Sequence, residues 1–288
     1  MKPRHLALLL LATVLSAGSV WTASQSSAQP SDAGAEEVDE RPTLWIIGDS
    51  TVRLNGAQGK GWGEVISPYF DTDRLQIKNR AIGGRSSRTF LTEGRWADIL
   101  EEAKAGDFVL MQFGHNDPIA PDNKDRPRGT IRGTGDEYVD IIHPQTNDPE
   151  RVFTFGWYMR QYVRYAQMKG MTPIVVSYIP RAPRRGETAN PELSSYALWA
   201  KEVAEQEDAA FVDLYGRVAS EYVKLEAEQP HVVKETMFVE GDRDYTHTSE
   251  AGAIFNAERL IEGLRDLDGT AGELATYLKD DPATRPGR

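Results

Sequence analysis

The chain contains 288 residues, with 33 lysines and arginines against 44 aspartates and glutamates, and it has no cysteine. Its formal net charge of −11 argues against general nucleic-acid binding, which needs a basic face to displace counterions from phosphates. The lack of cysteine excludes disulfides, thiolate zinc sites, iron–sulfur clusters and cysteine nucleophiles.

The N-terminus has the pattern of a secretory signal peptide. Basic residues precede an apolar run from Leu6 to Leu15, and small residues follow it as far as Ala28. We therefore expect residues 1–28 to direct export to the periplasm or the medium and to be removed. The apolar run is too short for a bilayer core of about 30 Å, so no membrane association is expected after removal. Residues 29–42 are mostly acidic or small and predict a flexible linker.

Short apolar runs alternate with longer amphipathic stretches over residues 43–267, which we assign to one domain. Buried strands are predicted at Leu44–Ile47, Leu75–Ala81, Phe108–Phe113, Ile174–Tyr178 and Phe211–Leu214. Helices are predicted over residues 63–70, 95–105, 155–169, 194–207, 216–228 and 249–264. Strands that are apolar on both faces and separated by helices indicate an α/β fold with a parallel sheet covered on each side. Five such units favour a flavodoxin-like sheet, in which ligands bind beyond the carboxyl ends of the strands.

Two segments interrupt this alternation. Residues 118–151, which follow the third predicted strand, show no clear period and are rich in Pro, Gly, Asp and Arg. Such a long loop in a compact domain is usually functional or disordered, and this one is expected to overhang the binding edge. Residues 268–288 are polar except for a weak helix near Leu274–Leu278, and we expect this C-terminal tail to fray.

A serine at the end of the first predicted strand is a candidate nucleophile. Gly48 permits a sharp turn after the strand, so that Ser50 is presented at its carboxyl end. The Gly-Asp-Ser tripeptide alone is weak evidence, because the serine could simply cap the next helix. A serine hydroxyl also needs an adjacent base, and the chain has only five histidines.

Among these histidines, His247 has the context of a catalytic base. Asp244 lies three residues upstream, a spacing that in a turn can bring its carboxylate to the ring Nδ1–H and leave Nε2 free for the serine. His143 and His231 lie in polar, proline-flanked stretches and are predicted to be surface residues. The alternative for His247 is a passive role in an N-cap cluster, because a helix is predicted to begin near Ser249.

Candidate donors for an oxyanion follow three neighbouring strands. The backbone N–H of Ser50 follows the first strand, Gly83-Gly84 follows the second and can free a backbone N–H, and Asn116 follows the third with a side-chain amide. Developing negative charge on an acyl oxygen requires such donors. Each motif alone could be an ordinary turn. The ordered set, with each member at a strand end or helix start, favours serine esterase chemistry.

These residues resemble the four blocks of the SGNH (GDSL-type) hydrolases, namely Gly48-Asp49-Ser50, Gly84, Gly114-His115-Asn116-Asp117 and Asp244-x-x-His247. A closer resemblance is to the rhamnogalacturonan acetylesterase family, and it is carried by Gly48-Asp49-Ser50-Thr51, Gly61-Trp62-Gly63-Glu64, Gly84-Arg85-Ser86-Ser87-Arg88, Glu93-Gly94-Arg95 and Asp244-x-Thr246-His247-Thr248-Ser249-x-Ala251-Gly252. The resemblance spans about Leu44 to Leu264 and implies a three-layer α/β/α sandwich with metal-free serine esterase chemistry and no cofactor. It implies Ser50 as nucleophile, His247 as base and Asp244 as its orienting acid. It also implies Ser50, Gly84 and Asn116 as oxyanion donors.

The implied substrate is an acetylated plant polysaccharide, with rhamnogalacturonan of pectin favoured. Eight arginines follow predicted strands or lie in the long loop: Arg85, Arg88, Arg126, Arg128, Arg132, Arg181, Arg184 and Arg185. Guanidinium groups suit uronate carboxylates, and Arg85, Arg88, Arg181 and Arg184 are the predicted substrate contacts. These arginines could equally be ordinary solvated side chains. Trp62, Trp96 and Trp157 could stack on sugars, but we expect them to fill the core.

Other functions stay open on the sequence alone. An SGNH esterase could act on acetylated xylan, an oligosaccharide, a lipid or a thioester, although no exposed apolar cap is evident to receive an acyl chain. A metal phosphoesterase could use the ligands Asp49, Asn116, Asp117, Asp244 and His247, but two-metal sites generally have more histidines and carboxylates. A non-catalytic carbohydrate-binding protein would need no Ser–His geometry.

Overall fold

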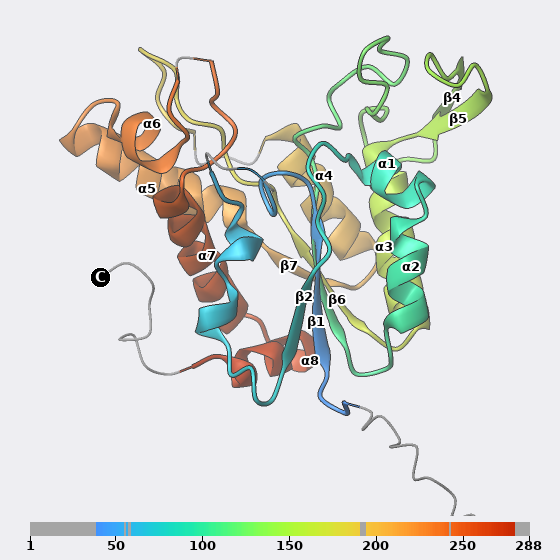
Figure 1. The fold of residues 1–288 in the computed structure, drawn as a ribbon, viewed down its shortest axis with the longest axis horizontal. Helices are drawn as coiled ribbons and strands as arrows, with labels where there is room; N and C mark the ends of the chain where they lie inside the picture. Colours follow the sequence, from blue (N-terminus) through green and yellow to red (C-terminus); the bar gives the residue numbers. More distant parts are fainter. Residues whose placement is uncertain (1–38, 55, 57–58, 191–193, 242, 280–288) are drawn as a thin grey trace, which may run out of the picture. The chain divides into compact units, whose positions relative to one another are not determined.

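The computed structural model describes residues 39–279, except for 55, 57–58, 191–193 and 242. Five parallel strands form the main sheet in the order β2-β1-β3-β6-β7 (Figure 1). These strands are β1 (Thr43–Gly48), β2 (Gln76–Asn79), β3 (Phe108–Gln112), β6 (Thr172–Val176) and β7 (Ala210–Val212). The order is flavodoxin-like, which confirms the predicted fold class. The predicted signal peptide and most of the predicted linker lie outside the described residues.

Helices cover both faces of this sheet (Figure 1). One face is covered by α1 (Ser87–Thr92), α2 (Arg95–Glu102), α3 (Phe155–Met168) and α4 (Ser195–Gln206). The other is covered by α5 (Leu214–Glu228) and α7 (Glu250–Arg265), together with the short α6 (Val232–Met237) and α8 (Gly269–Gly272). None of the helices in the described part of the chain has the length and the apolar run that a bilayer span requires.

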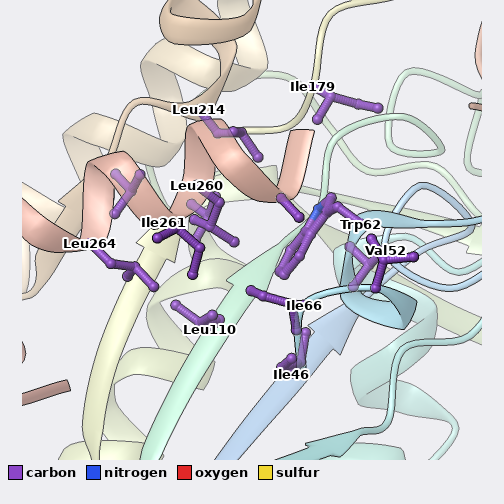
Figure 2. Close-up of a cluster of buried hydrophobic side chains, with 14 of the residues drawn as sticks. Ile46, Val52, Trp62, Ile66, Leu110, Ile179, Leu214, Leu260, Ile261 and Leu264 are labelled. Atoms are coloured by element: carbon purple, nitrogen blue, oxygen red, sulfur yellow. The ribbon is translucent and has the colours of Figure 1, made fainter. Parts of the chain in front are cut away.

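The alternation of side chains along β1 explains why the sheet is covered twice. Leu44 and Ile46 point into one core, which continues into α5 and α7, whereas Trp45 and Ile47 point into the other, which continues into α1 to α4. Figure 2 shows the first core, where Ile46 lies below Trp62 and α7 contributes Leu260. All of these side chains are fully buried, and each stabilises the fold by roughly 1.5–3 kcal/mol relative to exposure.

Two local elements differ from the sequence prediction. The helix expected over residues 63–70 is instead a pair of 3₁₀ turns, η1 (Trp62–Glu64) and η2 (Ser67–Tyr69). Pro68 lies in the first turn of η2 and has no N–H for a continuing α-helical ladder. Helix α1 was not predicted, because six residues are too few to show a helical period. It begins at a capping box in which the Ser86 hydroxyl accepts a hydrogen bond from the backbone N–H of Thr89.

The segment expected to be a structureless loop contains an antiparallel hairpin. Strands β4 (Tyr138–Ile142) and β5 (Pro149–Phe153) pair with each other and stand apart from the main sheet. Most of β4 is exposed, and Tyr138 and Ile142 are each more than half exposed. A strand with solvent near both faces carries no apolar alternation, so the sequence pattern does not record it.

Part of the C-terminal tail also departs from expectation, because residues 269–277 are folded rather than frayed, while residues 280–288 lie outside the described residues. Helix α8 runs into the 3₁₀ turn η3 (Glu273–Tyr277), and the side chain of Leu274 is fully buried. The ring of Tyr277 packs edge-on against Phe108, and the backbone N–H of Lys279 donates to the carbonyl of Tyr69. The weak helix expected near Leu274–Leu278 is therefore present as a 3₁₀ turn, in which apolar residues three apart share one face.

Candidate active site

The turn after β1 holds Ser50 at the carboxyl end of the sheet. The buried carboxylate of Asp49 accepts hydrogen bonds from the backbone N–H and the hydroxyl of Thr51, each at 2.8 Å. Position 48 requires glycine, because a Cβ there would lie 2.6 Å from the carbonyl oxygen of Gln112. The turn is therefore rigidly fixed below the serine.

Ser50, His247 and Asp244 form a continuous hydrogen-bonded relay. Ser50 Oγ lies 2.9 Å from His247 Nε2, although the two residues are 197 positions apart. His247 Nδ1 lies 2.7 Å from one carboxylate oxygen of Asp244. The other oxygen accepts the backbone N–H groups of Thr246 and His247, both at 2.9 Å. This geometry allows proton transfer from the serine hydroxyl to the imidazole.

The environment of Asp244 sets the tautomer of His247. Partial burial opposes ionisation of Asp244, but the hydrogen bonds from His247 and Thr246 outweigh it and hold the pKa of the carboxyl below its usual range. An ionised carboxylate can only accept hydrogen bonds, so the proton of the neutral ring lies on Nδ1. Nε2 is then the acceptor that faces the Ser50 hydroxyl.

Backbone contacts on both sides hold His247 in place. The backbone N–H of Val239 donates to the carbonyl of His247, and Lys60 and Thr248 exchange two hydrogen bonds. The N-cap of α7 is taken by Ser249, whose hydroxyl accepts the N–H of Gly252. Since Ser249 caps the helix, the His247 side chain is left to face the serine.

The three predicted oxyanion donors surround one pocket. Ser50, Gly84, Asn116 and His247 line a cavity of about 720 Å³. Gly84 adopts φ +80°, a left-handed conformation that other residues rarely adopt. One N–H of the Asn116 amide donates to the carbonyl of Arg85 at 2.9 Å, and the amide carries a second N–H.

The pocket wall carries several cationic side chains. Arg85, Arg126, Arg128 and Arg181 line it, and no aspartate or glutamate does so among the described residues. Arg85 and Arg181 were predicted as substrate contacts, whereas Arg126 and Arg128 come from the long loop. Because opposite charges attract strongly in a partly desolvated cavity, this wall suits an anionic ligand.

Two of the predicted contact arginines lie elsewhere. Arg88 is wrong as a substrate contact: its side chain is buried, donates to the backbone carbonyl of Pro127 and lies 3.6 Å from Glu150. A helix starting at Ser87 turns this side chain away from the pocket and under the long loop. Arg184 lies over the ring of Tyr245 and is not part of the pocket wall.

Two of the three tryptophans that were expected to fill the core do lie in it. Trp62 and Trp96 are buried, as expected, and Trp62 donates to the side chain of Gln112. Trp157 is only partly buried and stacks on Phe153 with ring centroids 4.1 Å apart.

Two buried titratable groups close to the site were assigned no catalytic role by the sequence. His115 lines the pocket and packs edge-on against Tyr178 with ring centroids 4.7 Å apart. Burial, together with the charge of Arg181, lowers the pKa of His115 well below its usual value, so the ring is neutral at pH 7. Asp117 is fully buried below the pocket. Both belong to the Gly114–Asp117 motif, which was the only sequence signal for them.

Within residues 39–279, apart from the gaps given above, no cluster of three or more histidine, aspartate or glutamate side chains is arranged to hold a metal ion.

Comparisons with known proteins show the family to which the chain is similar. A family model described as the GDSL-like lipase/acylhydrolase family matches residues 46–253. The chain is 30% identical over 227 residues to the probable rhamnogalacturonan acetylesterase YesY of Bacillus subtilis, a match that covers 78% of this chain and 93% of that protein. It is 29% identical over 222 residues to the rhamnogalacturonan acetylesterase of Emericella nidulans, which covers 77% and 84% of the two chains.

Solved structures are similar in fold. The crystal structure of the protein YxiM from Bacillus subtilis superposes with a TM-score of 0.58 at 23% identity. The match covers 78% of this chain and 56% of that one, so this chain spans little more than half of the solved structure.

Proposed function

The chain belongs to the GDSL-like lipase/acylhydrolase family and is a carboxylic ester hydrolase, and from this premise we propose that it removes O-acetyl groups from rhamnogalacturonan through an acetyl-serine intermediate. The observation that carries the proposal is the Ser50–His247–Asp244 relay, which opens into a pocket lined by arginines.

In the proposed first step, Ser50 Oγ attacks the acetyl carbonyl carbon while His247 Nε2 accepts the hydroxyl proton. The tetrahedral intermediate collapses as His247 returns that proton to the departing sugar oxygen, which leaves as a free hydroxyl. A water molecule then attacks the acetyl-serine with His247 again as base, and acetate leaves as Ser50 is regenerated. Asp244 stays ionised throughout and stabilises the imidazolium.

The proposed oxyanion donors are the backbone N–H groups of Ser50 and Gly84 and the side-chain amide of Asn116. All three residues line the same pocket as His247. A donor of this kind stabilises the transition state by roughly 3–4 kcal/mol.

The pocket charge supports an acidic polysaccharide as the substrate. The four arginines of the wall can pair with the uronate carboxylates of a pectic chain, and guanidinium groups bind carboxylates in a bidentate manner. The net charge of the whole chain would repel such a polymer, so the attraction has to be local. Two relatives at about 30% identity bear the name of rhamnogalacturonan acetylesterase.

The chemistry is tested with single substitutions assayed on an aryl acetate. We expect Ser50→Ala and His247→Ala to leave little activity, and Asn116→Ala to lose on the order of a hundredfold in kcat. Ser220→Ala on α5 is the matched control and should behave like the unmodified protein. A Ser50→Ala protein that keeps normal turnover, or that still reacts with a fluorophosphonate, would end the proposal.

The substrate is tested by acetate release from acetylated rhamnogalacturonan and acetylated xylan at two salt concentrations. We expect preference for the acidic polymer at low salt and a smaller preference at high salt, because salt screens the arginines. Arg126→Gln should reduce this preference, whereas Arg265→Gln, in the last turn of α7, should not. Preference for xylan that does not change with salt would contradict the substrate assignment.

We also propose that residues 1–28 are removed during export. The mature N-terminus is measured by mass spectrometry after fractionation of expressing cells, and we expect it near Gln29 outside the cytoplasm. Full-length chain retained in the cytoplasm would contradict this.

A further inference from the structure

Asp117 ties together the segments that carry two of the proposed oxyanion donors. One oxygen of its buried carboxylate accepts the backbone N–H of Ser87 at 3.1 Å and the Ser87 hydroxyl at 2.5 Å. The backbone carbonyl of Asp117 accepts the N–H of Thr130, which belongs to the long loop. Three segments that are distant in sequence therefore meet at this aspartate.

The proposed donors lie directly beside these contacts. Asn116 precedes Asp117, and its amide donates to the carbonyl of Arg85. Gly84 lies three residues before Ser87, and its carbonyl accepts a hydrogen bond at 2.8 Å from Arg128 of the long loop. The distance between the Asn116 amide and the Gly84 N–H is thus set where the 84–87 segment is held against residues 116 and 117.

Burial of this carboxylate is energetically costly. One of its oxygens has no hydrogen-bond partner among the described residues. The charge of Asp49, another buried carboxylate, further disfavours the ionised form of Asp117. Burial raises the pKa of Asp117 to about 7. Acidic residues whose pKa is strongly shifted by burial are often found at functional sites.

We propose that Asp117 is a positioning residue for the acyl-transfer step, acting through Ser87 to hold Gly84 and Asn116 at the spacing that an oxyanion requires. This inference rests on the function proposed above. A donor displaced by about 1 Å can cost on the order of a hundredfold in rate, so the contribution of Asp117 should appear in kcat rather than in substrate affinity.

The chain offers a matched control for the cost of burial itself. Asp107 is also buried, immediately before β3 and so at the opposite end of that strand from the pocket. Its carboxylate accepts the backbone N–H of Thr43 and the indole N–H of Trp45. Asp107→Asn therefore tests the effect of neutralising a buried, hydrogen-bonded aspartate that is remote from the donors.

The experiment compares Asp117→Asn, Ser87→Ala and Asp107→Asn by kcat and KM on an aryl acetate, per site titrated with a fluorophosphonate. Titration removes any unfolded fraction from the comparison. We expect kcat of Asp117→Asn and Ser87→Ala to fall roughly 10- to 100-fold, with KM changing less than about threefold. Asp107→Asn should keep the kcat of the unmodified protein, whatever its stability.

A double-mutant cycle with Asn116→Ala separates positioning from a general structural effect. If Asp117 acts through the oxyanion donors, Asp117→Asn should cost far less in kcat when Asn116 is already alanine. Multiplicative losses, or an unchanged kcat per titrated site in both Asp117→Asn and Ser87→Ala, would overturn the inference. An unmodified protein without esterase activity would sink the proposed function itself, whereas an active protein with an unaffected Asp117→Asn variant sinks only this inference.

Discussion

Replacing Asp244 by asparagine is the sharpest test of the relay, because it alters one atom of a fully defined hydrogen-bond set. The asparagine carbonyl can still accept the backbone N–H groups of Thr246 and His247, so the turn should keep its shape. The new amide can only donate to His247 Nδ1. The imidazole must then carry its proton on Nε2, where it can no longer accept the proton of Ser50.

We expect kcat to fall because the tautomer changes and because the negative charge 2.7 Å from the His247 ring is missing. A substitution of this kind lowers kcat by about 10,000-fold in a serine protease triad whose geometry stays intact. This corresponds to about 5.5 kcal/mol of transition-state stabilisation. Since Asp244 is only partly buried, water can replace some of the lost interaction, and we expect a loss between about 1,000- and 10,000-fold.

The assay is aryl acetate hydrolysis at neutral pH, with circular dichroism to establish that the variant is folded. Asp266→Asn, just after α7, removes a surface carboxylate that pairs with Arg217 and should leave kcat within about twofold. A folded Asp244→Asn variant that loses less than about tenfold in kcat would refute the assigned role of Asp244.

Three further predictions concern stability. Arg88→Met should lower the free energy of unfolding by about 2–4 kcal/mol, because it leaves Glu150 and the carbonyl of Pro127 without their partner. An unchanged urea midpoint would contradict this stabilising role of Arg88. Burial raises the pKa of Asp117 to about 7, so the native chain holds a proton that the unfolded chain releases above about pH 4. The free energy of unfolding of the unmodified protein should therefore fall by up to about 4 kcal/mol, relative to that of Asp117→Asn, as the pH rises from about 4 to 7. The same pH dependence of unfolding in both proteins would contradict this. Leu274→Ala should lower the free energy of unfolding, measured with urea, by about 2–5 kcal/mol, because the leucine side chain is fully buried. An unchanged free energy would mean that the C-terminal segment does not stabilise the domain.

The fold could be predicted because a doubly covered parallel sheet leaves a strong record in sequence. Fully buried strands such as β1 and β3 are apolar on both faces, and the long helices α3, α5 and α7 carry a clear period. The elements that were missed are short or exposed. Helix α1 has only six residues and most of the hairpin strand β4 is exposed, so neither imposes a clear pattern on the sequence.

The candidate site was predicted to the extent that local sequence and topology control it. Ser50, Gly84 and Asn116 each follow a parallel strand, and parallel strands bring their carboxyl ends to one edge. The structure brings His247 and Ser50 within hydrogen-bond distance, while their catalytic roles stay predictions for the experiments above.

What the sequence determined alone was the sheet order, the two faces of the core and the set of polar residues at one edge, because periodicity and strand ends are local properties. Only the tertiary structure decided which arginines face the pocket. Arg88 and Arg85 are three residues apart, yet one is buried under the long loop and the other lines the cavity. That difference depends on how the long loop, residues 118–151, packs over α1, and such long-range packing is not encoded in the spacing of residues along the chain.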